Sequence, residues 1–100
     1  MTARIRINDA PDAIRDRLPF IASSLTGHAF SITAESRGIG RLDGDDLEAW
    51  RADRLTIDYA VYSYLTPIAW HTEDGEWHIV AQTFSRTTAH HQGVVRRALG

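Results

Sequence analysis

The chain has 100 residues, 43% of them hydrophobic and 24% charged, a composition typical of one soluble globular domain spanning residues 1–100. It has no cysteine, and all 11 of its basic residues are arginine, so disulfides, thiolate metal sites, cysteine nucleophiles and lysine-dependent chemistry are excluded. No apolar run is long enough to span a bilayer, and the first residues lack the apolar stretch of a signal peptide, so we expect a cytoplasmic protein without membrane contact.

Charge is distributed unevenly along the chain. Residues 1–84 hold 13 acidic residues against eight arginines, a net charge of −5, whereas residues 85–100 hold three arginines and no acid, a net charge of +3. A basic C-terminal segment suits an anionic partner or the acidic surface of the protein itself.

The N-terminal residues predict a strand followed by a helix. Residues 4–7 alternate between polar and apolar side chains, as a half-buried strand does. Asn8 or Asp9 can cap the helix, and Pro19 should end it because proline removes a helical donor. The apolar stripe of this helix comprises Ala10, Ile14 and Leu18.

Residues 20–34 allow two interpretations. We predict a hairpin with strands 20–25 and 28–34 and a turn at Thr26-Gly27, because glycine is favoured in turns. The alternative is a kinked helix that continues through Ile21 and Leu25.

A loop and a second helix follow. Residues 35–42 contain two glycines and predict a loop. Asp43 or Asp45 should start the helix, because acidic side chains suit the positive end of the helix dipole, and the helix should end near Arg54. Its inward stripe comprises Leu47 and Trp50.

The next segment, 58–70, is rich in aromatic and β-branched residues and predicts strands of a meander. Both faces of its first strand are partly apolar, which indicates a central strand: Ile57, Tyr59 and Val61 should share one face, and Tyr62 and Tyr64 the other. Pro67 should lie at the strand connection, where it removes no ladder hydrogen bond.

Asp74-Gly75 predicts the second turn of the meander. A two-residue type I′ turn pairs His71 with His78 and Trp70 with Ile79. One face of this hairpin should then be core, with Ile68, Trp70, Trp77 and Ile79, and the other should be mostly wet, with Ala69, His71, Glu73, Glu76, His78 and Gln82.

The last helix should run from about Thr87 to Leu99. Its apolar stripe comprises His91, Val94, Val95, Ala98 and Leu99. Taken together, these elements predict an α+β domain of order β-α-β-β-α-β-β-β-α, with a mainly antiparallel sheet and the helices packed on one face.

Two groups of polar residues are candidate ligand sites. The cross-strand histidines with their flanking carboxylates suit a divalent metal, or else form a solvated face; these residues are His71, His78, Glu73 and Glu76. The start of the last helix suits an anion through Thr87, Thr88 and Gln92, with His91 beside them. Alternatively, Ser85 or Thr87 caps the helix while His91 and Gln92 pack or bond against the sheet.

Two further groups are candidate partner-binding surfaces. Basic residues on the last helix suit phosphates, or else form a solvated face: Arg86, His90, Arg96 and Arg97. Tyr62 and Tyr64 would form an exposed aromatic patch for a protein partner or a second copy if the sheet is open on one side.

Two segments, YSYLTPIAW (62–70) and FSRTTAHHQ (84–92), resemble a family of small uncharacterised proteins from actinobacteriophages and their actinobacterial hosts. A weaker likeness covers 40–42 and 51–53. The resemblance implies a common origin and fold, makes an accessory or host-modulating role plausible, and brings no catalytic residues.

The sequence carries no recognisable reaction signature, since Ser63 and Ser85 lie in no nucleophile-elbow or ordered triad motif. We therefore expect a non-enzymatic binding module, without cofactor, that acts on a protein partner or as a homo-oligomer. The alternative is a nucleic-acid-binding protein that uses the basic C-terminal helix.

Overall fold

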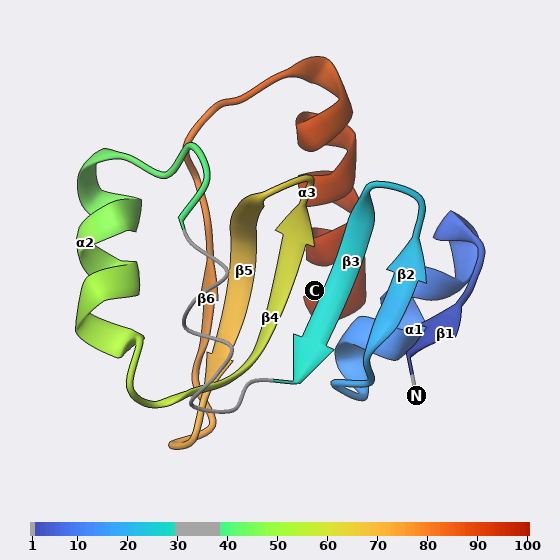
Figure 1. Cartoon of the computed structure of the whole chain (residues 1–100), viewed down its shortest axis with the longest axis horizontal. Coiled ribbons are helices and arrows are strands. Elements are labelled where there is room, and N and C mark those ends of the chain that lie inside the picture. Colours follow the sequence, from blue (N-terminus) through green and yellow to red (C-terminus); the bar gives the residue numbers. More distant parts are fainter. Residues whose placement is uncertain (1, 30–38) are drawn as a thin grey trace.

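A computed structural model describes residues 2–29 and 39–100 of the chain (Figure 1). Within these residues the elements are β1 (Ala3–Arg4), the 3-10 helix η1 (Ile7–Asp9), α1 (Ala10–Arg15), β2 (Phe20–Ala22), β3 (Leu25–Ala29), α2 (Gly44–Asp53), β4 (Ile57–Ser63), β5 (Thr66–Thr72), β6 (Trp77–Ile79) and α3 (Arg86–Leu99). The strands form one sheet in chain order, with β1 parallel to β2 and the other neighbours antiparallel. The predicted α+β class and element order are confirmed.

The helices cover both faces of the sheet, so the prediction that they pack on one face is wrong. Ile14 of α1 and Val94 of α3 pack against one face, whereas Trp50 of α2 packs against the other. Figure 1 shows α1 and α3 behind the strands and α2 well apart from them. The cause lies in β4, where Val61 faces the first cluster and Tyr62 the second, so apolar side chains need cover on both sides.

The N-termini of α2 and α3 follow the predicted caps, whereas at α1 the N-cap residue Asp9 makes no cap hydrogen bond through its side chain. Asp43 accepts a hydrogen bond from the Gly44 N–H (2.8 Å), and Ser85 accepts one from the Thr88 N–H (3.3 Å). The first helix, α1, ends at Arg15, before Pro19. Leu18, which was predicted on its apolar stripe, therefore lies outside the helix and is 53% exposed. Among the described residues, no helix has the length and apolar character that a bilayer crossing requires.

The first hairpin exists, but its predicted turn is misplaced and the helical alternative is wrong. Strands β2 and β3 connect through Ser23 and Ser24, with Ser23 in the left-handed region at φ 59°. Gly27 lies inside β3 opposite Phe20. A Cβ at this position would clash with the Phe20 ring and the Tyr59 hydroxyl, so the position requires glycine. Residues 30–34 of the predicted second strand lie outside the described residues.

The hairpin between β5 and β6 differs from the predicted register by one residue. The Gly75 N–H donates to the Thr72 carbonyl (2.9 Å), and Gly75 adopts φ 91°, so the connection is three residues long rather than two. Trp70 therefore pairs with His78, and His71 pairs with Trp77. Because side chains alternate along a strand, this shift moves every β6 side chain to the other face.

The predicted separation of indoles on a core face from imidazoles on a wet face is accordingly wrong, although Trp70 is fully buried as predicted. Trp70 and His78 share the α2 face with their rings stacked at 4.5 Å, while His71 and Trp77 share the opposite face. His71 is buried, and its Nδ1 lies 2.7 Å from a carboxylate oxygen of Asp58. This contact compensates for the loss of hydrogen bonds to water.

Strand β4 contains two register shifts against β5 that the alternation pattern does not show. The first shift places Ile57 on the α2 face, whereas Tyr59 lies on the opposite face. The prediction that these two residues share a face is therefore wrong. Pro67 lies within β5, opposite Tyr62 at the second shift, where an irregular ladder tolerates proline.

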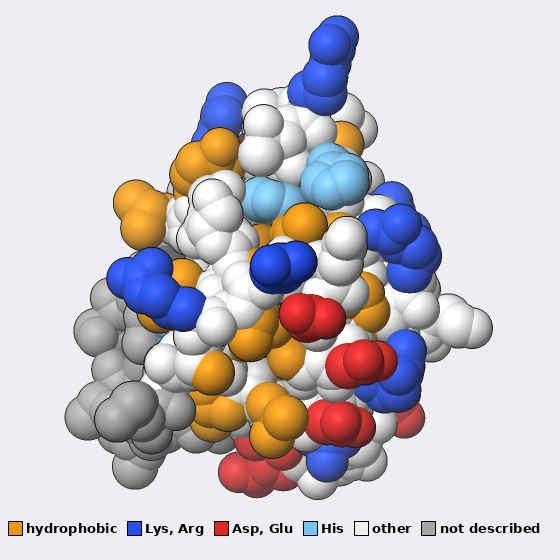
Figure 2. Space-filling model, turned by 90° about the vertical axis from the view of Figure 1, so that its right-hand side faces the viewer, with side chains coloured by type: hydrophobic (Ala, Val, Ile, Leu, Met, Phe, Trp, Pro, Cys, Tyr) orange, Lys and Arg blue, Asp and Glu red, His pale blue; other side chains and the backbone are white. Residues whose placement is uncertain are grey.

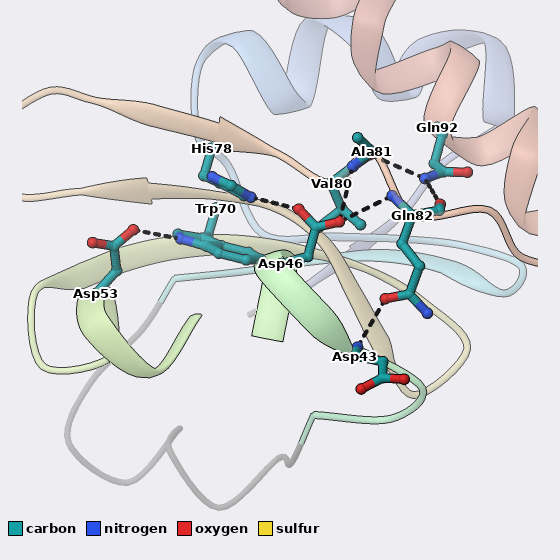
Figure 3. Close-up of polar contacts among 9 residues, drawn as sticks. All are labelled: Asp43, Asp46, Asp53, Trp70, His78, Val80, Ala81, Gln82 and Gln92. Carbon is teal, nitrogen blue, oxygen red and sulfur yellow. Dashed lines mark hydrogen bonds and ion pairs between the residues drawn. The ribbon is translucent and has the colours of Figure 1, made fainter. Parts of the chain in front are cut away.

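Asp46 of α2 anchors that helix to the chain that follows β6 (Figure 3). One carboxylate oxygen lies 2.9 Å from His78 Nε2, and the other accepts hydrogen bonds from the N–H groups of Ala81 (3.2 Å) and Gln82 (2.9 Å). From the other side, the Gln92 side chain of α3 donates to the carbonyls of Val80 and Gln82. The segment after β6 is thus held between two helices.

We expect Asp46→Ala to lower the free energy of unfolding by about 1 to 3 kcal/mol, because three donors lose their acceptor. Asp45→Ala is the matched control: Asp45 is the exposed neighbour on the same helix, and its removal should change stability by about 0.5 kcal/mol or less. Urea denaturation of the three proteins measures both effects. Equal stability of the two variants would show that Asp46 does not anchor α2.

Candidate functional site

A pocket of about 610 Å³ lies at the end of the sheet where the β4–β5 turn meets the start of α3. Figure 1 shows these two elements and the loop that leads into α2 at the same end of the molecule. The pocket walls are formed by Gly40, Arg41, Ser63, Tyr64, Leu65, Thr66, Phe84, Ser85, Thr87 and Thr88.

The rim of the pocket is an exposed apolar turn. Ser63 pairs with Thr66, so Tyr64 and Leu65 form the two-residue connection between β4 and β5. Tyr64 is 58% exposed and Leu65 is 76% exposed. Tyr64 adopts φ 55°, a conformation that costs a tyrosine on the order of 1 kcal/mol or more, and its N–H donates to the Ser24 carbonyl (2.8 Å). The fold therefore holds two large apolar side chains in water.

The opposite wall is the first turn of α3. Thr87 is exposed and lines the pocket, whereas Thr88 is buried. Ser85 caps the helix, as one of the two interpretations of this segment predicts. Gln92 lies deeper and is occupied by the carbonyls of Val80 and Gln82, so it is not available to a ligand in the pocket. The three predicted anion-binding residues thus have different surroundings.

A buried network of three side chains joins the two walls. Ser63 Oγ lies 2.7 Å from His91 Nδ1 and 2.9 Å from Thr88 Oγ1. Burial lowers the pKa of His91, and the charge of His90 lowers it further. A neutral imidazole can accept the Ser63 hydroxyl proton in a hydrogen bond, while the Thr88 hydroxyl donates to Ser63. The network links the last residue of β4 to α3.

This hydroxyl–imidazole pair is the simplest arrangement in which a serine can be activated as a nucleophile. Ser63 is only 1% exposed, however, and in the described part of the chain no carboxylate hydrogen-bonds to His91. The geometry fits a role in positioning the β4–β5 turn. The sequence analysis grouped Thr88 with His91 and gave a polar contact of His91 with the sheet as one alternative, which the structure confirms, but it did not assign Ser63 as the partner. A histidine within an apolar helix stripe is a sign that a buried polar partner exists.

The predicted metal residues are not brought together. His71 and His78 lie on opposite faces of the sheet, each beside a different aspartate, and Glu73 and Glu76 are exposed in the hairpin. Over residues 2–29 and 39–100, no group of three or more histidine, aspartate or glutamate side chains could hold a metal ion.

The predicted partner-binding residues divide into two sets. Tyr62 is buried beneath α2, near Trp50, so it forms no exposed patch with Tyr64. The basic residues of α3 are all exposed: Arg86, His90, Arg96 and Arg97. Figure 2 shows basic side chains at separate places on one face of the molecule, with apolar and acidic side chains between them.

A family model matches residues 21–96 of the chain, and its description is a family of unknown function (DUF8033). The matched range includes every residue that lines the pocket. Comparison with curated proteins finds no match, and comparison with solved structures finds none either.

The lowered pKa of His91 has a consequence for stability. Because the folded-state pKa lies below the unfolded value of about 6.5, the unfolded chain binds more protons as the pH falls through this range. The free energy of unfolding should therefore fall with falling pH below about 6.5, and level off below the folded-state pKa.

His91→Gln should show a smaller fall than the wild type, and His90→Gln should retain most of it, because burial is the larger cause of the shift. Urea denaturation at a series of pH values from 7.5 to about 5 measures the difference. The remaining titratable groups are shared by the three proteins and cancel in the comparison. The assignment would be contradicted if His91→Gln kept the full pH dependence of the wild type. It would also be contradicted if His90→Gln lost the pH dependence while His91→Gln kept it.

Proposed function

This chain belongs to the family of unknown function DUF8033, and we propose that it is a small non-enzymatic binding module that recognises a protein partner through the Tyr64–Leu65 turn and the adjoining pocket. The observation that carries the proposal is the exposure of two large apolar side chains at the rim of a pocket. Tyrosine is enriched at protein interfaces, and an exposed apolar group beside a hollow marks an interaction surface.

The position of the turn supports this proposal. A smaller hollow of about 130 Å³ is lined by His28, Tyr62, Tyr64 and Leu65. Tyr64 and Leu65 therefore line two hollows, which suits a partner with more than one contact at the turn better than a compact ligand.

The residues that support a phage-type accessory role also meet here. The two segments that resemble small actinobacteriophage and actinobacterial proteins, 62–70 and 84–92, supply eight of the ten lining residues of the larger pocket. We propose that this pocket is the part of the molecule on which the accessory or host-modulating role depends.

Binding of nucleic acid through α3 is the second candidate. It is favoured by three exposed arginines in a segment without acidic residues, Arg86, Arg96 and Arg97. Against it stand the small number of these arginines and the net charge of −2 of the whole chain. A salt titration with random-sequence DNA decides: binding that weakens steeply with salt and is reduced in Arg96→Gln/Arg97→Gln supports this candidate, and absence of salt-sensitive binding removes it.

For the main proposal, Leu65→Asp should abolish retention of the partner, because a charged side chain at the rim disfavours an apolar contact. Leu55→Asp is the matched control, since Leu55 is 75% exposed, close to the 76% of Leu65, but lies between α2 and β4 away from the pocket. The immobilised wild type and both variants are incubated with an actinobacterial lysate and the retained proteins are compared by mass spectrometry.

Proteins retained by the wild type and Leu55→Asp but not by Leu65→Asp would support the turn as the binding surface. Retention unaffected by Leu65→Asp would reject it. If the retained protein is the chain itself, light scattering at increasing concentration should show a dimer that Leu65→Asp dissociates.

A further inference from the structure

The charge of the larger pocket differs from that of the protein as a whole. The chain carries 13 acidic residues, yet none of the described ones lines this pocket, and among residues 2–29 and 39–100 its single charged lining residue is Arg41. Arg86 lies between the lining residues Ser85 and Thr87 and adds a second exposed cation close by. A positive site on a negatively charged body attracts anionic groups selectively.

Arg41 is held in place through its backbone rather than through its charge. Its N–H donates to Thr66 Oγ1 (2.9 Å), and its carbonyl accepts from Gln82 Nε2 (2.9 Å). Thr66 is the first residue of β5, and the Asp43 N–H in turn donates to Gln82 Oε1 (2.8 Å). The base of the arginine is therefore fixed to the sheet and to the segment after β6.

The guanidinium group of Arg41 is free to bind a ligand. Among residues 2–29 and 39–100, the arginine ion pairs are Arg15 with Asp12 and Arg51 with Glu48, and Arg41 has none. An exposed guanidinium with five donors binds a carboxylate through two parallel hydrogen bonds.

Apolar groups lie beside this cation. Tyr64 and Leu65 form the rim, and the half-buried Phe84 lies in the wall contributed by the segment before α3. The hydroxyls of Ser85 and Thr87 complete the opposite side. The pocket thus offers one apolar contact surface and one cationic donor at short range from each other.

We propose that the pocket binds a segment of a partner polypeptide in which a large apolar side chain is followed or preceded closely by an aspartate or glutamate. The apolar side chain contacts Tyr64, Leu65 and Phe84, and the carboxylate binds Arg41. This inference rests on the proposed function, because it specifies the chemistry of the partner at the same turn.

The test selects ligands without assuming their sequence. Random twelve-residue displayed peptides are panned against the immobilised full chain, and the strongest binder is synthesised in its acidic form and in a form with Asn or Gln in place of Asp or Glu. Both peptides are titrated by fluorescence anisotropy against the wild type, Arg41→Gln, Arg54→Gln and Leu65→Asp. Arg54 is an exposed arginine at the end of α2 that does not line the pocket, and serves as the matched control.

The selected peptides should combine an acidic with a large apolar residue. Arg41→Gln should weaken the acidic peptide by at least about tenfold and the amide peptide by much less, since it removes a charge-assisted hydrogen bond that only the acidic form makes. Arg54→Gln should leave both affinities unchanged.

Failure of this inference is distinguishable from failure of the proposed function. If Leu65→Asp abolishes binding but Arg41→Gln weakens both peptides equally or neither, the inference is overturned and the proposed function stands. If no peptide is selected, the inference is overturned and the proposed function is decided by the lysate experiment. If binding survives Leu65→Asp, both are overturned. If random-sequence DNA binds in a salt-sensitive manner that Arg41→Gln removes, the pocket belongs to a nucleic acid and the inference is overturned.

Discussion

The fold depends on the burial of the central strand pair, β4 and β5, on both faces. Every residue of β5 and all but one residue of β4 are buried, so α1 and α3 are needed on one side and α2 on the other. Polar side chains in these strands cannot reach bulk water and require partners from the covering elements. Ser63 obtains one from the covering helix α3, through His91, whereas His71 obtains one from Asp58 of the neighbouring strand β4. The same requirement fixes the β4–β5 turn relative to α3 and so forms the pocket.

Much of the fold follows from local sequence signals, and what does not follow is set by tertiary contacts. The α3 stripe is a local signal and was predicted correctly, and the caps Asp43 and Ser85 are each one of the two residues predicted for that position. The β5–β6 register was not, because Asp-Gly fits both a two-residue turn and a three-residue connection ending in a left-handed glycine. The local sequence around Gly27 predicts a turn. The need for glycine at this position comes instead from the closeness of Phe20 and Tyr59, which no local pattern reveals.

The candidate site was predictable only in part. Tyr64, Thr87 and Thr88 were singled out from the sequence, but as members of two unrelated groups. Arg41 was absent from the prediction because a lone arginine in a glycine-containing loop carries no periodic signal. Its place beside Thr66 comes from a hydrogen bond that spans 25 residues of chain. Long-range contacts of this kind are invisible to reasoning from spacing along the sequence.

Strand β6 is an outer strand of the sheet and only three residues long, and the carboxylate of Asp46 occupies the N–H groups of Ala81 and Gln82 directly beyond it. An incoming β-strand needs such donors to extend a sheet by backbone pairing. At Ala81 and Gln82 these donors are already engaged within the molecule, so an incoming strand finds no free N–H group at these two residues. Backbone pairing at this border is thereby confined to the three residues of β6 itself.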